Sequence, residues 1–336
     1  MMELNFEQIR EMTWGAARIT EENGRLCFYR CTKEQEEQLH SRHEEFYCHS
    51  LGSAGIKFVF QTNSRVLSLK VRVEHVTERM RFSFDVFSNG ELVGYLDNFS
   101  DIELPIGEKF IELPTGDFEK KFILGDGEKK VCVHFPYSAK GMVYGVELDD
   151  GASFMPIKPT KKLLAYGDSI TQGYYALRSS NRYVARLADY LDAEEVNKGI
   201  GSDRFWPDYA KLREAKSPDY IVVGYGTNDW RSNRTRETYR ENSRAFIQTL
   251  REYYPDAKMI VITPIWRKDY TDERPFGNFL ELDSELRDVI GNIEGLTIVR
   301  GFDLVPHEER YYGDLWLHPN DEGFEQYFKN LVQSIK

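Results

Sequence analysis

The second half of the chain alternates short apolar runs with segments whose apolar residues recur at helical spacing. In residues 181–193, for example, Tyr183, Val184, Leu187 and Leu191 fall on one helical face. Repeated strand–helix units form a mostly parallel sheet with helices on both faces, because parallel strands need crossover connections. We therefore predict a parallel sheet with strands at 162–166, 195–199, 219–224, 258–263 and 296–300.

In the first half of the chain, apolar residues recur with a different spacing from that in the second half. The apolar runs of the first half alternate with polar residues one by one, which is typical of strands with one buried face. Ser88-Asn89-Gly90-Glu91 follows one of these runs and is typical of a tight hairpin turn. No long amphipathic helix is apparent. We predict a β-sandwich of the jelly-roll type, with strands at 55–61, 66–73, 81–87, 130–135 and 141–148.

The two halves meet at a stretch that contains Gly151-Ala152-Ser153, Pro156 and Pro159. Glycine and proline interrupt regular structure, so this stretch is a plausible linker. We expect an all-β accessory domain at residues 1–158 and an α/β domain at residues 159–336. The accessory domain either binds carbohydrate or covers part of the second domain, and the pattern does not decide between these roles.

Composition narrows the class of partner. The formal net charge of −11 disfavours a general surface for nucleic acid or an anionic membrane. No apolar run approaches the roughly 20 residues that span a bilayer, and no basic-then-apolar signal segment begins the sequence. None of the four cysteines is needed to staple a chain of 336 residues, so we expect a cytoplasmic protein. The oligomeric state stays open.

A cluster of cysteine and histidine residues in the first half has two interpretations, a zinc site or ordinary packing. The cluster has no Cys-x-x-Cys pair, and its spacing matches no common zinc finger. Two of its cysteines have the same parity on a predicted strand, which suits small core residues. We therefore favour packing over a metal site for Cys27, Cys31, His40, His43, Cys48 and His49.

Polar residues follow the predicted parallel strands where each strand ends. Ser169 follows the first strand, the turn 199–203 the second and Asn228 the third, while His318 precedes the last helix. The carboxyl ends of parallel strands share one edge of the sheet, so these groups are expected to converge. Acyl transfer needs a nucleophile, a base that removes its proton, and donors for the oxyanion. Taken singly, a helix cap, a turn former and a loop histidine are the simpler interpretations.

The same segments resemble the sequence blocks of SGNH (GDSL-type) hydrolases. They occur in the family's order and span residues 167–318: Gly167-Asp168-Ser169-Ile170, Asn197 to Asp203, Gly226-Thr227-Asn228-Asp229, and Asp314 to His318. Each block alone is a weak signal, but four in order are specific. The resemblance implies a flavodoxin-like three-layer α/β/α domain that hydrolyses a carboxylic ester without a metal or organic cofactor. A preceding β-sandwich also resembles some carbohydrate esterases.

Carried over to this sequence, the resemblance makes Ser169 the nucleophile and, through its N–H, an oxyanion donor. Asn228 is a second donor, and His318 is the base that later protonates the leaving alcohol. Ser202 aligns with the family's oxyanion glycine, with Gly201 as the donor if the alignment shifts by one residue. Asp314 precedes His318 by four positions rather than three. Either the loop bulges so that Asp314 reaches His318, which we favour, or a backbone carbonyl orients the histidine.

Aromatic and basic residues follow the same strand-end loops. Indole rings stack on the apolar faces of sugars, and arginine binds carboxylate or phosphate. The alternative roles are loop packing for the tryptophans and pairing with acidic residues for the arginines. We predict a substrate-lining role for Trp206, Trp230, Trp266, Trp316 and Arg267, with Arg204 and Arg231 as further basic neighbours.

The leading hypothesis is a serine esterase whose substrate is a small-molecule or carbohydrate ester, including an acetylated sugar. One alternative is an acyltransferase that uses the same nucleophile. Another is a non-catalytic carbohydrate-binding protein, for which the displaced Asp314 is the best support.

Overall fold

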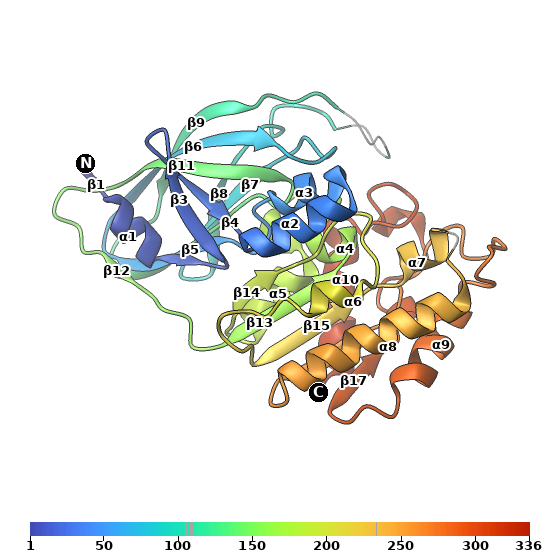
Figure 1. The fold of residues 1–336 in the computed structure, drawn as a ribbon. Coiled ribbons are helices and arrows are strands. Elements are labelled where there is room, and N and C mark those ends of the chain that lie inside the picture. The colour runs from blue at the N-terminus through green and yellow to red at the C-terminus, as the bar shows by residue number, and fades with distance from the viewer. Residues whose placement is uncertain (105–106, 108–110, 233) are drawn as a thin grey trace.

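The computed structural model describes residues 1–104, 107, 111–232 and 234–336. Two antiparallel sheets form from the first part of the chain, and a parallel sheet forms from the last part (Figure 1). Within the described residues, none of the helices combines the length and the apolar character that crossing a membrane requires.

The two antiparallel sheets confirm the predicted β-sandwich, and all five predicted strands are present. Phenylalanine rings from the two sheets meet in one core. The ring centroid of Phe58 in one sheet lies 5.7 Å from that of Phe28 in the other. The predicted hairpin turn carries positive φ at Asn89 and Gly90, as a type I′ turn requires. The first sheet has the order β3 (Arg18–Glu22), β4 (Arg25–Tyr29), β11 (Ala139–Leu148), β6 (Val66–His75) and β9 (Gly116–Ile123), with β1 (Met2–Glu3) beside β11. The second has the order β12 (Met155–Pro156), β5 (Lys57–Thr62), β10 (Lys129–His134), β7 (Ser83–Ser88) and β8 (Glu91–Asp97), with β2 (Thr13–Trp14) beside β5.

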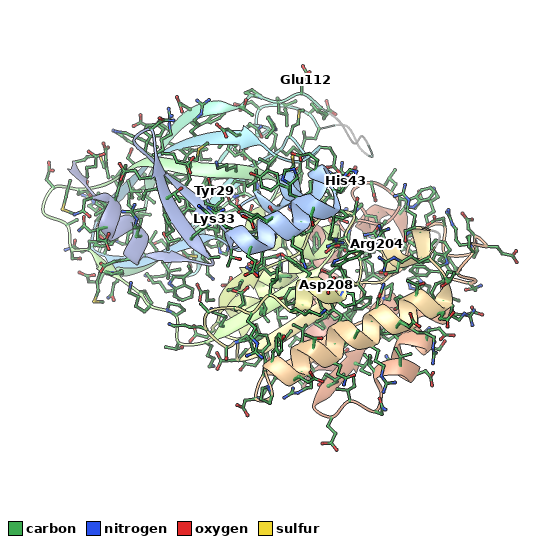
Figure 2. All side chains as sticks on the ribbon, viewed as in Figure 1. Tyr29, Lys33, His43, Glu112, Arg204 and Asp208 are labelled. Carbon is green, nitrogen blue, oxygen red and sulfur yellow. The ribbon has the colours of Figure 1, made fainter. Side chains whose placement is uncertain are left out.

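The first half also contains helices that its apolar pattern did not indicate: α1 (Phe6–Glu11), α2 (Lys33–Arg42) and α3 (Glu44–Ser50). Helix α2 begins with a capping box between Thr32 and Gln35. Its buried face includes the polar side chains of Gln35 and Glu36, so no apolar stripe reveals it. Lys33 and His43 mark the two ends of α2, which faces the segment of the second domain that carries Arg204 and Asp208 (Figure 2).

The parallel sheet confirms the α/β prediction, and all five predicted strands are present. Its order is β14 (Glu194–Asn197), β13 (Lys162–Gly167), β15 (Tyr220–Gly224), β16 (Lys258–Ile262) and β17 (Leu296–Val299). In sequence order this is 2-1-3-4-5, the flavodoxin-like arrangement. Successive strands are added to one side of β13 and then to the other, so the strand order reverses between β13 and β15. In such sheets ligands bind above the carboxyl ends of the strands at this point.

Alternating side chains of β13 face two helical layers. Leu163 and Ala165 pack in the core formed with α5 (Tyr183–Tyr190) and α10 (Asp321–Ser334). Leu164 and Tyr166 pack in the core formed with α6 (Pro207–Ala210), α8 (Arg236–Tyr253) and α9 (Glu281–Ile290). Cys31, Leu39 and Phe46 join this second core, so the segment that carries α2 and α3 packs against the α/β domain (Figure 1).

One fully buried guanidinium joins the two domains. Arg30 lies just after β4 and is 0% exposed. It donates to the carbonyl oxygens of His49 and Gly52 in its own domain, and to those of Asn197 and Gly199 at the end of β14, at distances of 2.8–2.9 Å. Burial lowers the pKa of this guanidinium, but the reference value is so high that arginine stays charged. Arg30 therefore fixes the loop after β14 against the sandwich.

Replacing Arg30 with Met is expected to lower the free energy of unfolding by at least about 3 kcal/mol. The reason is that each buried carbonyl left without its hydrogen-bond donor costs about 1–3 kcal/mol. Urea denaturation followed by circular dichroism measures this. The control is Arg65→Met, because Arg65 and its partner Asp126 are 73% and 84% exposed and such pairs contribute about 0–1 kcal/mol. A loss no larger than that of the control would contradict a stabilising role for Arg30.

Candidate active site

A hydrogen-bonded chain of three side chains lies at the carboxyl edge of the parallel sheet. Ser169 begins the short helix α4 (Ser169–Gln172) directly after β13. Its Oγ lies 2.8 Å from Nε2 of His318, and Nδ1 of His318 lies 2.7 Å from Oδ2 of Asp314. This brings together three of the residues that the sequence predicted to act together. Ser169 is only 6% exposed, which limits the number of water molecules that compete for its hydroxyl.

A glycine makes the sharp connection before Ser169 possible. A Cβ atom at position 167 would lie 2.0 Å from Oγ1 of Thr171 and 2.7 Å from the carbonyl oxygen of Gly224. Asp168 caps α4, since its side chain accepts a hydrogen bond from the N–H of Ile170. Burial, opposed by this bond and reinforced by the charges of Asp203 and Asp229, raises the pKa of Asp168 to about 7.

The loop from Asp314 to His318 explains the unusual spacing. Leu315 has φ of 56°, in the left-handed region, and this turn accommodates the extra residue. Oδ1 of Asp314 accepts hydrogen bonds from the N–H groups of Trp316, Leu317 and His318 at 2.8–3.1 Å, which leaves Oδ2 for the imidazole. Although burial opposes ionisation, the charge and hydrogen bonds of His318 and these backbone bonds hold the pKa of Asp314 far below its usual range.

Two tyrosine rings pack against the imidazole of His318. Tyr175 stacks on it with ring centroids 5.6 Å apart, and the ring of Tyr174 lies 5.9 Å away. The guanidinium of Arg79, from the connection between β6 and β7, lies 5.1 Å from the ring centroid of Tyr174 and 4.4 Å from that of Tyr175. The accessory domain thus contributes to the surroundings of the histidine.

Two further predicted residues follow β14 and β15, the strands on either side of β13. Asn228, in α7 (Thr227–Arg231), donates one amide hydrogen to the carbonyl oxygen of Asp203 at 2.9 Å, and an asparagine amide has a second hydrogen to donate. The N–H of Gly201 is already bonded to Oε1 of Gln172. This engagement favours the N–H of Ser202 over that of Gly201 as a donor to a ligand. Ser202 has φ of 64°, another left-handed residue.

The prediction that four tryptophans line the substrate site needs correction. Trp230 is fully buried in the core beneath α8, and Trp266 is 7% exposed and stacks on His307. Tryptophan after a strand end packs inward as readily as outward, so its position in the sequence did not reveal its direction. Trp316 is 42% exposed, and Trp206 is partly buried with the guanidinium of Arg42 at 4.5 Å.

Arg267 was also predicted to line the substrate site, and this prediction is wrong. Its side chain is 1% exposed and donates to both oxygens of Asp269 and to Oγ1 of Thr227. The donors of this guanidinium are engaged by protein acceptors, so they are not presented to a substrate. Of the other two arginines, Arg204 is partly buried and Arg231 is exposed.

Sequence reasoning missed the residues that the accessory domain brings to the site. Arg42 forms a buried ion pair with Asp203, next to Ser202. For His49 the sequence analysis weighed only packing and a metal site, yet its ring contacts the carbonyl of Gly201. Its contact with the loop after β14 links positions more than 150 residues apart, which no local pattern reports.

The cysteine and histidine cluster is dispersed over several elements. Cys27 packs beside Tyr29 and Met142, Cys31 lies in the core of the α/β domain, and His40 pairs with Glu44. Across the part of the chain that the structure describes, no group of three or more histidine, cysteine, aspartate or glutamate side chains is arranged to hold a metal ion.

Comparison with solved structures shows a shared two-domain fold. A salicylyl-acyltransferase from a tetracycline biosynthetic pathway is 18% identical with a TM-score of 0.78, and the match covers 96% of this chain and 93% of that one. A structure described as a GDSL-like lipase from Bacteroides ovatus is 19% identical with a TM-score of 0.75, covering 97% and 95%. A family two carbohydrate esterase from Clostridium thermocellum is 15% identical with a TM-score of 0.64, covering 85% and 92%.

No curated protein matches the sequence. Residues 165–326, in contrast, match the model of the GDSL-like lipase/acylhydrolase family. This match extends from β13 through α10's first turns and includes Ser169, Ser202, Asn228, Asp314 and His318. The part of the chain that carries the parallel sheet is therefore similar to the GDSL-like lipase/acylhydrolase family.

Proposed function

We propose that the protein hydrolyses a carboxylic ester through an acyl-enzyme formed on Ser169. The observation that carries this proposal is the hydrogen-bond chain from Asp314 through His318 to the Ser169 hydroxyl. A serine hydroxyl is a weak nucleophile until a base within hydrogen-bond reach removes its proton. Nε2 of His318 is within that reach at 2.8 Å.

In the first step Oγ of Ser169 attacks the ester carbonyl carbon while its proton moves to Nε2 of His318. The carbonyl oxygen becomes an oxyanion, which accepts hydrogen bonds from the N–H groups of Ser169 and Ser202 and from the side chain of Asn228. When the tetrahedral intermediate collapses, the bond to the alcohol oxygen breaks and the imidazolium gives its proton to that alcohol. The products are the free alcohol and the acyl-Ser169 ester.

In the second step water attacks the acyl carbon and gives its proton to His318, which returns it to Ser169 as the carboxylic acid leaves. Asp314 bonds to Nδ1–H throughout, so it holds the imidazole in the tautomer whose Nε2 accepts a proton. It also stabilises the imidazolium that forms between the two proton transfers.

For the substrate we propose an acylated carbohydrate whose acyl group is acetyl. Support comes from the family two carbohydrate esterase, which shares the two-domain fold. The ring of Trp316 adds support, since it is 42% exposed two positions before His318, and indole stacks on sugar faces. We further propose residues 1–158 as the accessory domain and 159–336 as the catalytic domain.

The decisive variant is Ser169→Ala. It is expected to abolish release of acetate from acetylated sugars and from 4-nitrophenyl acetate, with an unchanged circular dichroism spectrum, because no other group supplies the attacking oxygen. Retained turnover would refute the acyl-enzyme. Adding an alcohol acceptor to the wild-type assay separates hydrolysis from transfer: acetate as the sole product supports a hydrolase, whereas an acetylated acceptor identifies an acyltransferase.

Asp314→Asn tests the orienting role. Asn Oδ1 can still accept the three backbone bonds, so the loop is expected to persist. Its Nδ2 donates to Nδ1 of His318, which moves the imidazole proton to Nε2 and leaves Ser169 without an acceptor. We expect kcat to fall on the order of 10³–10⁴-fold, as for the equivalent change in a serine protease triad.

The matched control for that variant is Asp303→Asn, since this carboxylate is 61% exposed and pairs only at the surface with Arg300. Steady-state kinetics with 4-nitrophenyl acetate compares the two. A less than tenfold loss for Asp314→Asn would show that Asp314 does not set the tautomer.

Ser202→Gly tests whether the donor at position 202 is the backbone amide. Glycine keeps the N–H and adopts the φ of 64° without the cost that a side chain carries there. We expect kcat/KM within about threefold of wild type and a free energy of unfolding that is equal or up to about 1 kcal/mol higher. A tenfold loss of kcat/KM in both Ser202→Gly and Ser202→Ala would show that the hydroxyl acts instead.

A further inference from the structure

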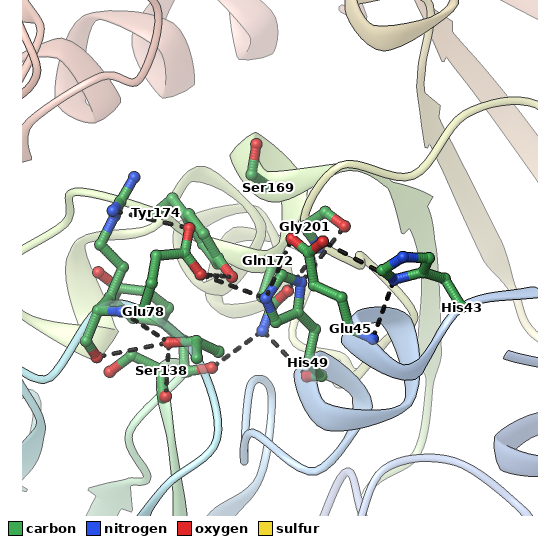
Figure 3. A network of polar contacts seen from close by, with 12 residues as sticks. His43, Glu45, His49, Glu78, Ser138, Ser169, Gln172, Tyr174 and Gly201 are labelled. Atoms are coloured by element: carbon green, nitrogen blue, oxygen red, sulfur yellow. Dashed lines mark hydrogen bonds and ion pairs between the residues drawn. The ribbon is translucent and has the colours of Figure 1, made fainter. Parts of the chain in front are cut away.

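One peptide unit links the accessory domain to the oxyanion site. The carbonyl of Gly201 and the N–H of Ser202 belong to the same planar unit, and in a trans peptide they point in opposite directions. Nδ1 of His49 lies 3.3 Å from the carbonyl oxygen of Gly201 (Figure 3). A donor that holds this carbonyl on one side therefore fixes the direction of the Ser202 N–H on the other.

His49 is placed to act as such a donor. It lies in α3 and is 2% exposed. Its second nitrogen, Nε2, lies 3.2 Å from Oε2 of Glu78 and 3.8 Å from Oε1 of Glu45. Both ring nitrogens thus face oxygen acceptors, and an imidazole donates from both only when it carries both protons.

Glu78 places a carboxylate beside Nε2 of His49. Burial opposes its ionisation, but the hydrogen bond from His49 and the charge of Arg79 together lower the pKa of Glu78 to about 2. The same carboxylate accepts a hydrogen bond from Oη of Tyr174 at 3.4 Å (Figure 3). The ring of Tyr174 lies beside that of His318, with centroids 5.9 Å apart. Glu78 thereby contacts both sides of the site, the oxyanion loop through His49 and the general base through Tyr174.

The loop after β14 is shaped to admit the imidazole. A Cβ atom at position 201 would lie 2.5 Å from Nδ1 of His49 and 2.7 Å from Oη of Tyr174. Only glycine leaves room for both groups. The N–H of Gly201 is bonded to Gln172, whose Nε2 donates to the carbonyl of His49 at 3.2 Å, so a second route holds the same two segments together.

We propose that His49 and Glu78 of the accessory domain are positioning residues for the oxyanion site of the α/β domain. The pair orients the Gly201–Ser202 peptide and polarises it, so that the Ser202 N–H becomes a stronger donor to the oxyanion. This inference rests on the proposed acyl-enzyme function, and it assigns to the sandwich a part in stabilising the transition state. Neither residue touches the substrate.

Three variants and one matched control test the pair. Glu78→Gln keeps the shape of the side chain and removes the negative charge that faces Nε2 of His49. His49→Gln keeps a neutral donor at the same reach, and His49→Ala removes it. Glu45→Gln is the control, because Glu45 carries the same charge toward the same nitrogen but lies 3.8 Å away and is 47% exposed.

The readout is reaction of Ser169 with a fluorophosphonate, which forms a tetrahedral adduct and does not depend on the choice of ester. The amplitude of labelling counts folded sites, and the rate constant reports oxyanion stabilisation. We expect full amplitude in all variants, with the rate constant lowered about 10–100-fold in Glu78→Gln and His49→Ala, less in His49→Gln, and unchanged in Glu45→Gln. In ester hydrolysis kcat falls in the same order, while KM stays within about twofold because the loss is confined to the transition state.

Three results would overturn the proposal. Wild-type rate constants in Glu78→Gln and His49→Ala would remove any positioning role. A reduced amplitude with a wild-type rate constant would show that the pair only stabilises the fold. Failure of the wild-type protein itself to react at Ser169 would refute the acyl-enzyme and, with it, the positioning role. This outcome is distinguishable from the first one, in which the wild-type protein is labelled normally.

Discussion

The arrangement of the site depends on the guanidinium of Arg30, which is buried where two domains meet. It donates hydrogen bonds to carbonyl oxygens in the last turn of α3, in the turn that follows α3, and at the end of β14. Buried carbonyls need donors, and a single rigid fork of N–H groups satisfies those of both domains at once. The end of β14 leads directly into Gly201 and Ser202, so the same contact sets how far His49 lies from the oxyanion loop.

Other cations reinforce this boundary. Nζ of Lys198 is fully buried and bonds to the carbonyl of Arg30 and to Gln35, while Arg42 pairs with Asp203. Buried charges are costly to leave unpaired, so sliding one domain over the other would break several such pairs together. A boundary of this kind favours one relative position of the domains. That constraint lets a residue of the sandwich act on a peptide of the α/β domain with the accuracy that an oxyanion site needs.

The sequence was sufficient for features that depend on local pattern. Strand–helix alternation predicted the parallel sheet. The position of Ser169 at a strand end predicted its place at the edge where it meets His318, because the carboxyl ends of parallel strands share one edge. Side-chain direction was not predictable in this way, as buried Trp230 and Arg267 demonstrate. The contact of His49 with Gly201 depends on how the two domains dock, which no local pattern indicates. Helix α2 was not predicted, because its buried face includes polar side chains and therefore shows no apolar stripe.

Backbone strain is distributed unevenly, and its location supports the same interpretation of the site. Among the described residues, six other than glycine have positive φ, and three of them, Asn23, Asn89 and Asp192, are of the types that tolerate it in turns. The remaining three are Tyr175, Ser202 and Leu315, whose side chains gain nothing from this conformation. Tyr175 stacks on His318, Ser202 carries the N–H that we propose as an oxyanion donor, and Leu315 makes the turn that lets Asp314 reach the imidazole. Strain of about 1–3 kcal/mol per residue persists only where surrounding contacts enforce it. Here the enforcing contacts include the cross-domain ones, so the sandwich helps to hold the α/β domain in a conformation that its own backbone preferences oppose.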